Sequence, residues 1–460
     1  MDPNHDVGHT SSAHRLSSKW PAALRCLALA VLCCTVSCKR SAPPIEALDD
    51  DARAYVRLAV ALGERDKESL DYYYGPPELV ADIHKNPPTY PEIKKSALAL
   101  EEQIRQLEIT DPVQKQRVDF LLRQLKAIAV RIDILTIGQQ QNEMPFDRES
   151  EALLGIKAPA TYDKEHLAQV RAEIDRAIGG TGSLATRYAA FDQKFAIPPK
   201  LIPAVMTRAI AACRQITAAH IPLPAGESTT LEYTTNQPWS AFSRYYGNLH
   251  SVLQLNTDFV LTVDRALQLA CHEGYPGHHV FNSTRDATLV RKTQWPELTV
   301  QTTFSPQSLI SESAAVYATQ LAFTDAERLE FERKELFPLA GLDAAQAEKY
   351  LRVERLVDQL HVVEPSIARG YLDGTLEYLH ASEALENEAL MAHTKATLLY
   401  LNEYRSYVLT YTYGVDLMQS YIEGPDPGKS TIEERWQRYH DLMTQPDIDI
   451  TGNRADTKSN

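Results

Sequence analysis

Apolar residues recur at helical spacing through much of the N-terminal half of the chain. Residues 111–135 show this period from Val118 onward, with Asp111 at the N-cap position and Pro112 in the first turn. The same spacing in residues 93–107 and 201–219 predicts two further helices. The N-terminal half is therefore predicted to be largely helical.

The pattern changes between residues 222 and 260, where Thr, Tyr and Trp alternate with apolar side chains. Residues 229–235 and 250–257 have the two-residue period of half-buried strands, so a small sheet is expected here. Helical spacing returns in residues 262–270 and leads directly into His272. Further helices are predicted at residues 309–323, 344–362, 376–408 and 431–443. The pattern indicates a mainly α fold with a small β-sheet.

The N-terminus has the composition of an export signal. Basic residues precede an apolar run at residues 26–36, which is shorter than the roughly twenty residues that span a bilayer. Residues 35–38 resemble the lipobox of bacterial lipoproteins, in which Cys38 would carry the lipid. A plain secretory signal that is cut nearby is the alternative. Lys39 is not the Asp associated with inner-membrane retention, which favours the outer membrane facing the periplasm.

Composition and charge narrow the class of protein. With 460 residues, 44% of them hydrophobic and 23% charged, the chain is predicted to be globular. The net charge of −14 argues against nucleic acid as a partner, because phosphate binding needs a positive surface. Beyond the signal the chain has only Cys213 and Cys271. These two cysteines could pair in an oxidising periplasm, but two unpaired buried thiols are the more ordinary outcome.

Residues 272–279 read His-Glu-Gly-Tyr-Pro-Gly-His-His and combine metal ligands with a carboxylate. Zinc hydrolases need imidazole or carboxylate ligands, an open position for water, and a carboxylate that takes the proton. In an ordinary H-E-x-x-H helix the second His follows one turn after the first, but Pro276 stands there in this chain. On an undistorted helix His278 would lie about 240° around from His272, and His279 about 10 Å along the axis. Neither would share an ion with His272.

A local distortion at Pro276 and Gly277 would resolve this conflict. Pro removes a helical hydrogen bond and Gly tolerates a bulge, so the next His would return towards His272. We therefore predict His278 as the second ligand. His279 is then a neighbouring or substrate-contacting residue, or the ligand itself if the bulge is larger. A histidine-rich corner without a metal is the alternative.

Other candidate site residues lie elsewhere in the chain. Glu312 falls on a predicted helix of small and apolar residues, where a cation would offset the cost of burying a carboxylate, so it is predicted as the third ligand. An exposed Glu at a helix end is the alternative. Glu273 directly follows a ligand and is predicted as the general base. Tyr411 or Tyr407 would donate a hydrogen bond to an oxyanion, unless both are core aromatics. Arg405 would bind a substrate carboxylate, unless it is simply exposed.

These residues resemble a known family, the bacterial proteins of domain of unknown function 885, which are grouped with the thermolysin-like zinc metallopeptidases. The family pattern H-E-x-x-P-G-H-H is met by residues 272–279. The later pattern E-G-W-A-x-Y-A is met in part, by Glu312, Ala315, Tyr317 and Ala318. The resemblance implies a zincin-like catalytic core embedded in a helical body, with Zn²⁺ held by two His and one Glu. It also implies peptidase activity.

The sequence thus predicts a zinc-dependent hydrolase, a metallopeptidase of the carboxypeptidase or dipeptidase type that acts on a peptide or small amide. A membrane-tethered binding lipoprotein without turnover and a hydrolase of non-peptide amides or esters are the alternatives. Membrane contact is expected only through the N-terminal lipid, and the sequence does not indicate the oligomeric state. The expected organisation is a signal (1–38), a tether (39–48), a helical region (49–221) continuous with a catalytic region (222–445), and a polar tail (446–460).

Overall fold

The computed structural model describes residues 44–137, 144–237, 239–426 and 428–451. Within these residues the protein is mainly α-helical with few, short strands, as the sequence pattern predicts. The predicted export signal, with the lipidation residue Cys38, lies outside the described residues. No helix in the described part is both long enough and apolar enough to cross a lipid bilayer.

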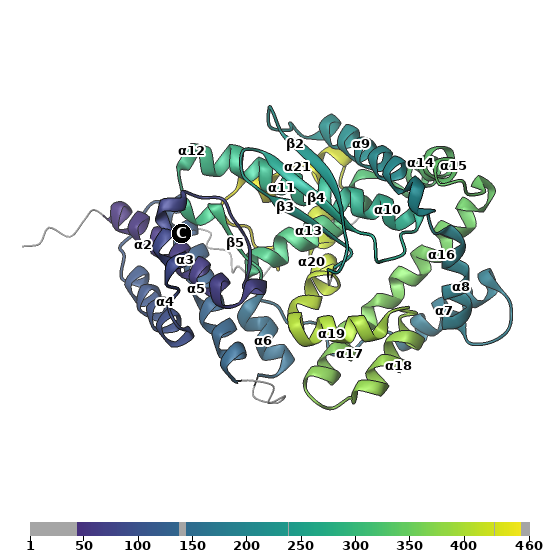
Figure 1. The fold of residues 1–460 in the computed structure, drawn as a ribbon, viewed down its shortest axis with the longest axis horizontal. Helices are drawn as coiled ribbons and strands as arrows, with labels where there is room; N and C mark the ends of the chain where they lie inside the picture. Colours follow the sequence, from purple (N-terminus) through teal and green to yellow (C-terminus); the bar gives the residue numbers. More distant parts are fainter. Residues whose placement is uncertain (1–43, 138–143, 238, 427, 452–460) are drawn as a thin grey trace, which may run out of the picture. The chain divides into compact units, whose positions relative to one another are not determined.

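Three long helices near the N-terminus pack against one another and enclose an apolar core of their own (Figure 1). They are α2 (Pro44–Arg65), α4 (Tyr90–Arg105) and α5 (Pro112–Ile137). The Asp111 carboxylate accepts a hydrogen bond from the backbone N–H of Gln114 at 2.9 Å. This bond satisfies one of the free donors at the start of α5, so the predicted N-cap is confirmed.

Two small sheets accompany the helices. Strands β2 (Ser228–Thr234), β3 (Ala241–Tyr245) and β4 (His250–Asn256) form a sheet of order β2-β4-β3, in which β2 runs parallel to β4 and β3 antiparallel. Strands β1 (Leu70–Tyr73) and β5 (Val300–Thr302) form an antiparallel pair. The predicted strands at 229–235 and 250–257 are therefore confirmed, and β1 and β5 join the N-terminal helices to the middle of the chain.

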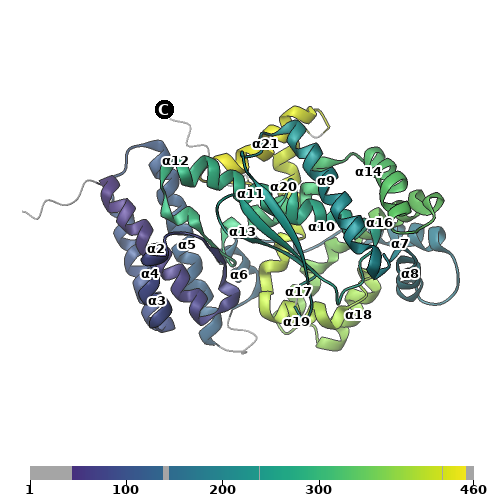
Figure 2. The ribbon, with the colours of Figure 1, turned by 45° about the horizontal axis from the view of Figure 1, so that its top comes forward.

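The remaining helices pack in or around the two apolar cores, and α3 (Ala81–Lys85) contacts α2 of the N-terminal group; Figures 1 and 2 show them together with the three-stranded sheet. They are α3 (Ala81–Lys85), α6 (Phe146–Leu153), α7 (Lys164–Ile178), α8 (Leu184–Asp192), α9 (Ile202–His220), α10 (Val263–Leu269), α11 (His278–Arg285), α12 (Arg291–Thr293), α13 (Pro306–Ala322), α14 (Asp325–Phe331), α15 (Phe337–Leu339), α16 (Ala347–Leu360), α17 (Glu364–Leu372), α18 (Tyr378–Glu388), α19 (Thr394–Tyr404), α20 (Tyr413–Glu423) and α21 (Ile432–Thr444).

The packing does not follow the expected division at residue 221. One apolar cluster joins residues 48–132 to residues 289–300, and the other spans residues 127–450. The chain from Pro44 onward nevertheless forms one compact unit. The segments 49–221 and 222–445 therefore contribute to shared cores and are interleaved in space.

The two ends of the expected body lie further out than predicted. Helix α2 begins at Pro44, so the segment expected to be a tether (39–48) is already helical in its last residues. At the other end, Ile450 is buried, and the Arg123 guanidinium forms an ion pair with Asp447. The first part of the predicted polar tail (446–460) therefore packs on the body, because it carries apolar and ion-paired side chains.

The helix predicted at residues 376–408 is wrong as a single element. It is divided into α18 and α19, followed by a 3₁₀ segment, η12 (Arg405–Thr410). The breaks fall where Leu390 and Arg405 adopt positive φ angles of 56° and 51°. L-residues rarely adopt this conformation, so apolar periodicity alone gave no sign of the breaks.

The two cysteines of the body form a disulfide between Cys213 in α9 and Cys271, with their Cα atoms 5.6 Å apart. The expectation of two unpaired thiols is therefore wrong. Since the residues lie far apart in sequence, their distance in space depends on how α9 packs beside the segment that carries Cys271, which sequence spacing does not reveal.

Candidate metal centre

The segment that carries His272 and Glu273 is a π-helical turn, η6 (Ala270–Gly274), which continues α10. It packs between α9 and α13, and the disulfide joins it to α9. Single π-helical turns inserted into α-helices occur frequently at functional sites. The position of this turn is thus fixed by its packing on α9 and α13 and by the disulfide.

The helix ends immediately after this turn. Tyr275 has extended backbone angles, the Tyr275–Pro276 peptide bond is cis, and α11 begins at His278. A Cβ atom on Gly277 would lie 1.8 Å from the carbonyl O of His272, so only glycine permits this close approach. The predicted distortion at Pro276 and Gly277 is confirmed, in the form of a break between two helices. It brings the rings of His272 and His278 to a centroid distance of 4.7 Å.

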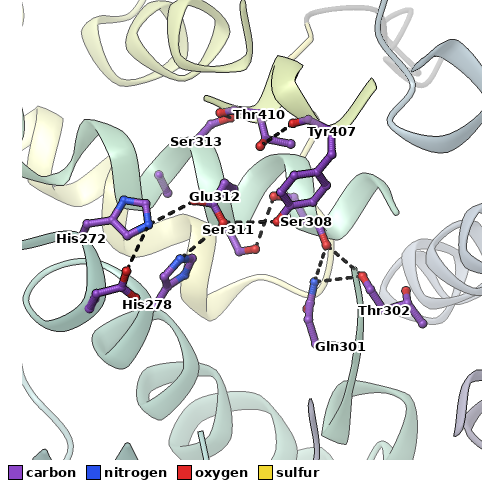
Figure 3. Close-up of polar contacts among 12 residues, drawn as sticks. His272, His278, Gln301, Thr302, Ser308, Ser311, Glu312, Ser313, Tyr407 and Thr410 are labelled. Atoms are coloured by element: carbon purple, nitrogen blue, oxygen red, sulfur yellow. Dashed lines mark hydrogen bonds and ion pairs between the residues drawn. The ribbon is translucent and has the colours of Figure 1, made fainter. Parts of the chain in front are cut away.

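Both imidazoles face the carboxylate of Glu312, which projects from α13 (Figure 3). Nε2 of His272 lies 3.1 Å from Oε1 of Glu312, and Nε2 of His278 lies 3.4 Å from Oε2. The three residues each offer a ligand atom, and these atoms lie within 4.8 Å of one another. Ligands at zinc distances in a tetrahedron would be separated by about 3.3 Å, which is close to the distances of the two imidazoles from Glu312.

The donor set fits a divalent cation. Glu312 is 6% exposed, and its Oε1 accepts no hydrogen bond in the described part of the chain despite its proximity to His272. A buried carboxylate oxygen without a hydrogen bond is costly. Imidazole nitrogens and carboxylate oxygens that converge on one point are the ligand types that zinc takes in catalytic sites. His272, His278 and Glu312 are therefore the candidate metal ligands.

The charges around the site are strongly coupled. Burial opposes ionisation of Glu312, but His278 and His272 outweigh it and hold its pKa well below the usual range. Burial also raises the pKa of Glu273, and it raises that of Asp71 on β1 to about 7. Three carboxyl groups thus share a confined space, and a bound cation would compensate their charge.

Glu273 lies beside the three candidate ligands without joining them. It is 7% exposed, and its Oε1 lies 3.9 Å from Nε2 of His272. Glu273 also borders a small apolar recess whose walls include Leu253 and Leu255 of β4. Its carboxylate therefore lies next to the candidate ligands His272, His278 and Glu312 but is not one of them.

The two candidate tyrosines have different positions. Tyr407 lies in η12, is buried, and donates a hydrogen bond from its hydroxyl to Oε2 of Glu312 at 3.2 Å. In Figure 3 it lies on the side of Glu312 away from the two imidazoles. Tyr411 is 40% exposed, and its ring is 5.8 Å from that of Tyr407. Tyr407 thus positions a candidate ligand, whereas Tyr411 is a partly exposed residue whose ring packs on that of Tyr407.

His279 is not among the candidate ligands. It is fully buried, and its Nδ1 and Nε2 lie 2.8 Å from Ser251 Oγ and 2.9 Å from Glu227 Oε2. The same Glu227 carboxylate accepts hydrogen bonds from Tyr275 and Arg214. His279 therefore anchors α11 to the sheet, and the alternative in which it binds the metal does not fit this geometry.

Arg405 does not reach the candidate site. Its guanidinium pairs with the buried carboxylate of Glu149 and donates to the carbonyl O of Met144 at 3.2 Å. The predicted role in binding a substrate carboxylate is therefore wrong, because its donors are already engaged with α6 and the residues before it.

Tyr439 and Asp71 contribute to the site, although no pattern in the sequence predicted a role for either residue. The hydroxyl of Tyr439 in α21 lies 3.2 Å from the carbonyl O of Pro276 and 3.2 Å from that of Ala314, which holds the helix break against α13. Asp71 reaches the site from β1, and one of its buried carboxylate oxygens has no hydrogen-bond partner in the described residues. Both contacts join segments far apart in sequence, so local patterns do not reveal them.

Comparison with known proteins identifies no family. No protein-family model matches the chain, and no curated protein matches it. Among solved structures, it is similar to a protein from Shewanella oneidensis described as a candidate lipoprotein of unknown function. That likeness has 11% identity and a TM-score of 0.40, and covers 79% of this chain and 76% of the other. A likeness of this size says nothing about the function of either protein.

Proposed function

We propose that the protein is a zinc-dependent hydrolase of peptide bonds. The observation that carries this proposal is the convergence of His272, His278 and Glu312, with the carboxylate of Glu273 directly beside them. The resemblance of residues 272–279 to the family of domain of unknown function 885 supports the same class of reaction.

The chain supplies the other groups that amide hydrolysis needs. Zn²⁺ held by the three ligands would polarise a water molecule and the substrate carbonyl. Glu273 accepts the proton of the attacking water and returns it to the leaving amine. The Tyr411 hydroxyl donates a hydrogen bond to the developing oxyanion, and Tyr407 keeps Glu312 in place. A protein that only binds its ligand would not require a general base at Glu273.

We also propose that the protein is exported and anchored by a lipid on Cys38, in the outer membrane and facing the periplasm. The lipobox-like residues 35–38 support the anchor. The disulfide between Cys213 and Cys271 is consistent with an oxidising compartment. Expression of the full chain with labelled fatty acid tests this proposal. Label is expected in the wild type and not in Cys38→Ser, and an unlabelled wild type would contradict the anchor.

Metal analysis and turnover together test the hydrolase. Protein purified without chelator is expected to hold about one zinc per chain and to cleave members of a panel of di- and oligopeptides. Glu273→Gln is expected to retain zinc and lower kcat by about 10²- to 10⁴-fold. The matched control is Glu232→Gln, an exposed position on β2. Absence of zinc would end the proposal, whereas bound zinc with no turnover of any peptide would favour a binding protein.

A further inference from the structure

Helix α10 and the π-helical turn that follows it are buried along nearly their whole length. Within residues 261–277, only Arg265, Gln268 and His272 are not buried. Their spacing of three and four residues places them on one helical face. Because that face carries the candidate ligand His272, a single solvent-accessible stripe leads from the metal centre to Arg265.

The side chain of Arg265 is directed along this stripe. Its Nη1 donates a hydrogen bond to Oε1 of Gln268 at 3.2 Å, and the amide nitrogen of Gln268 donates to Asp264 at 2.9 Å. Gln268 thus fixes the guanidinium on the side nearer His272. His272 follows Gln268 by four positions, which is about 6 Å along the axis.

Arg265 lies near carboxylates but forms no ion pair with one of them in the described part of the chain. No salt bridge in the described part of the chain includes it, and the neighbouring Asp264 is paired with Arg328 instead. An arginine on a convex surface is commonly unpaired, so its surroundings decide whether this matters. The surroundings of Arg265 include groups of the candidate site.

Arg265 lies close enough to groups of the candidate site for their charges to act on it. Burial lowers the pKa of Arg265, while Glu273, Tyr411 and Asp358 are among the groups that raise it. Arg265, Tyr411 and Asp358 nevertheless keep exposed side-chain surface. We infer that Arg265 and Tyr411 face the candidate site from its solvent-accessible side.

We propose that Arg265 binds the C-terminal carboxylate of the peptide substrate and so makes the enzyme an exopeptidase that releases one or two residues. This inference rests on the proposed function. A guanidinium matches a carboxylate in a bidentate pair. Gln268, to which the guanidinium is hydrogen-bonded, lies about 6 Å along the helix axis from His272, which corresponds to one or two residues of extended chain. Water adds across the scissile amide bond, the acyl part gains hydroxide, and the amine that leaves with the proton carries the carboxylate bound to Arg265.

Binding measured without turnover tests this role. In zinc-loaded Glu273→Gln protein, calorimetry would compare trialanine, its C-terminal amide, and the amide of Ala-Glu-Ala. Trialanine is expected to bind about 10- to 100-fold more tightly than either amide. Arg265→Ala in the same background should abolish this preference, while Arg265→Lys should keep part of it. Arg53→Ala, at an exposed position of α2, is the matched control and should behave like its parent.

The outcomes separate this inference from the proposed function. A preference for trialanine that survives in Arg265→Ala, or equal binding of acid and amide by the parent, would overturn the role of Arg265. Tighter binding of the Ala-Glu-Ala amide would also overturn it, because the guanidinium would then bind an acidic side chain. Arg265-dependent binding of trialanine without hydrolysis by the wild type would support the carboxylate site while refuting the hydrolase. Thermal unfolding of each variant checks that it is folded.

Discussion

His278 and His279 are adjacent in sequence and in α11, yet their side chains belong to two different networks. His279 is fully buried, and both of its ring nitrogens lie within hydrogen-bonding distance of a polar side chain, Ser251 or Glu227. His278 keeps 17% of its side chain exposed, and its Nε2 lies 3.4 Å from Glu312. Both ring nitrogens of His279 therefore have hydrogen-bond partners. His278 instead faces Glu312, which has an oxygen that accepts no hydrogen bond in the described residues.

The carboxylates at the centres of the two networks differ in the same way. Glu227 accepts hydrogen bonds from Tyr275 and Arg214 in addition to its contact with His279. Glu312 accepts one from Tyr407, and its other oxygen has no hydrogen bond in the described residues. Buried groups with all partners present stabilise a fold, whereas unused ligand atoms that converge on one point are available to an ion. Proximity within a motif therefore does not assign a role, but hydrogen-bond completeness separates the two histidines.

The largest expected effect is the loss of zinc from His278→Ala. Removing a ligand should weaken zinc binding by more than the 10- to 100-fold typical of residues that only hydrogen-bond a ligand, and activity should be lost with the metal. His279→Ala should instead retain about one zinc per chain but lower the free energy of unfolding by about 1–3 kcal/mol, because Glu227 and Ser251 lose a buried partner. Metal analysis and urea unfolding of both variants give the comparison. Zinc retained in His278→Ala and lost from His279→Ala would reverse the assignment.

The second largest effect is expected on turnover, from the loss of the Tyr411 hydroxyl. Tyr411 is 40% exposed, and its ring packs on that of Tyr407, which bonds to Glu312. Tyr411→Phe is expected to lower kcat by about 10²- to 10³-fold, as removal of one oxyanion donor does elsewhere, with zinc content unchanged. Tyr246→Phe, another exposed tyrosine, is the control. Equal kcat values for the wild type and Tyr411→Phe would remove this residue from the mechanism.

The sequence predicted the elements of the site better than their connections. The pattern at residues 272–279 was sufficient to predict a distortion at Pro276 and Gly277, because an undistorted helix cannot direct His272 and His278 at one ion. Helix positions such as that of α5 followed from apolar spacing and an N-cap. The pairing of Arg405 with Glu149 was not predictable, since it depends on how α6 packs beside η12. Local spacing gives secondary structure, and contacts between distant segments decide which polar side chains are free.

Loss of folding stability at low pH is expected to come in part from the hydrogen-bond network around Glu227. Burial opposes ionisation of Glu227, but hydrogen bonds from His279, Tyr275 and Arg214 lower its pKa to about 2 from 4.5. A lowered carboxyl pKa adds stability above pH 4.5, and this contribution is lost as the pH falls towards 2. The shift corresponds to about 3 kcal/mol in the free energy of unfolding.

Urea unfolding of zinc-free wild type and Glu227→Gln between pH 3 and 6 measures this contribution. The wild type should be the more stable protein at pH 6, and the difference between the two should shrink as the pH is lowered. Because both proteins lack zinc, loss of the metal at low pH does not enter the comparison. A difference that stays constant over this range would show that Glu227 is not held ionised by its network.

The smallest effect is expected from Tyr407→Phe, which removes the one hydrogen bond that Glu312 accepts. If Glu312 is a metal ligand, this bond orients it, and its loss should weaken zinc affinity by about 10- to 100-fold. If Glu312 is instead a structural carboxylate like Glu227, the loss should lower the free energy of unfolding of the zinc-free protein and leave zinc affinity unchanged. Competition with a chelator of known affinity, combined with urea unfolding of the zinc-free protein, separates these results. Because Tyr407 is buried against the carboxylate and not exposed beside it, kcat of the fully zinc-loaded variant should stay close to that of the wild type, in contrast to Tyr411→Phe.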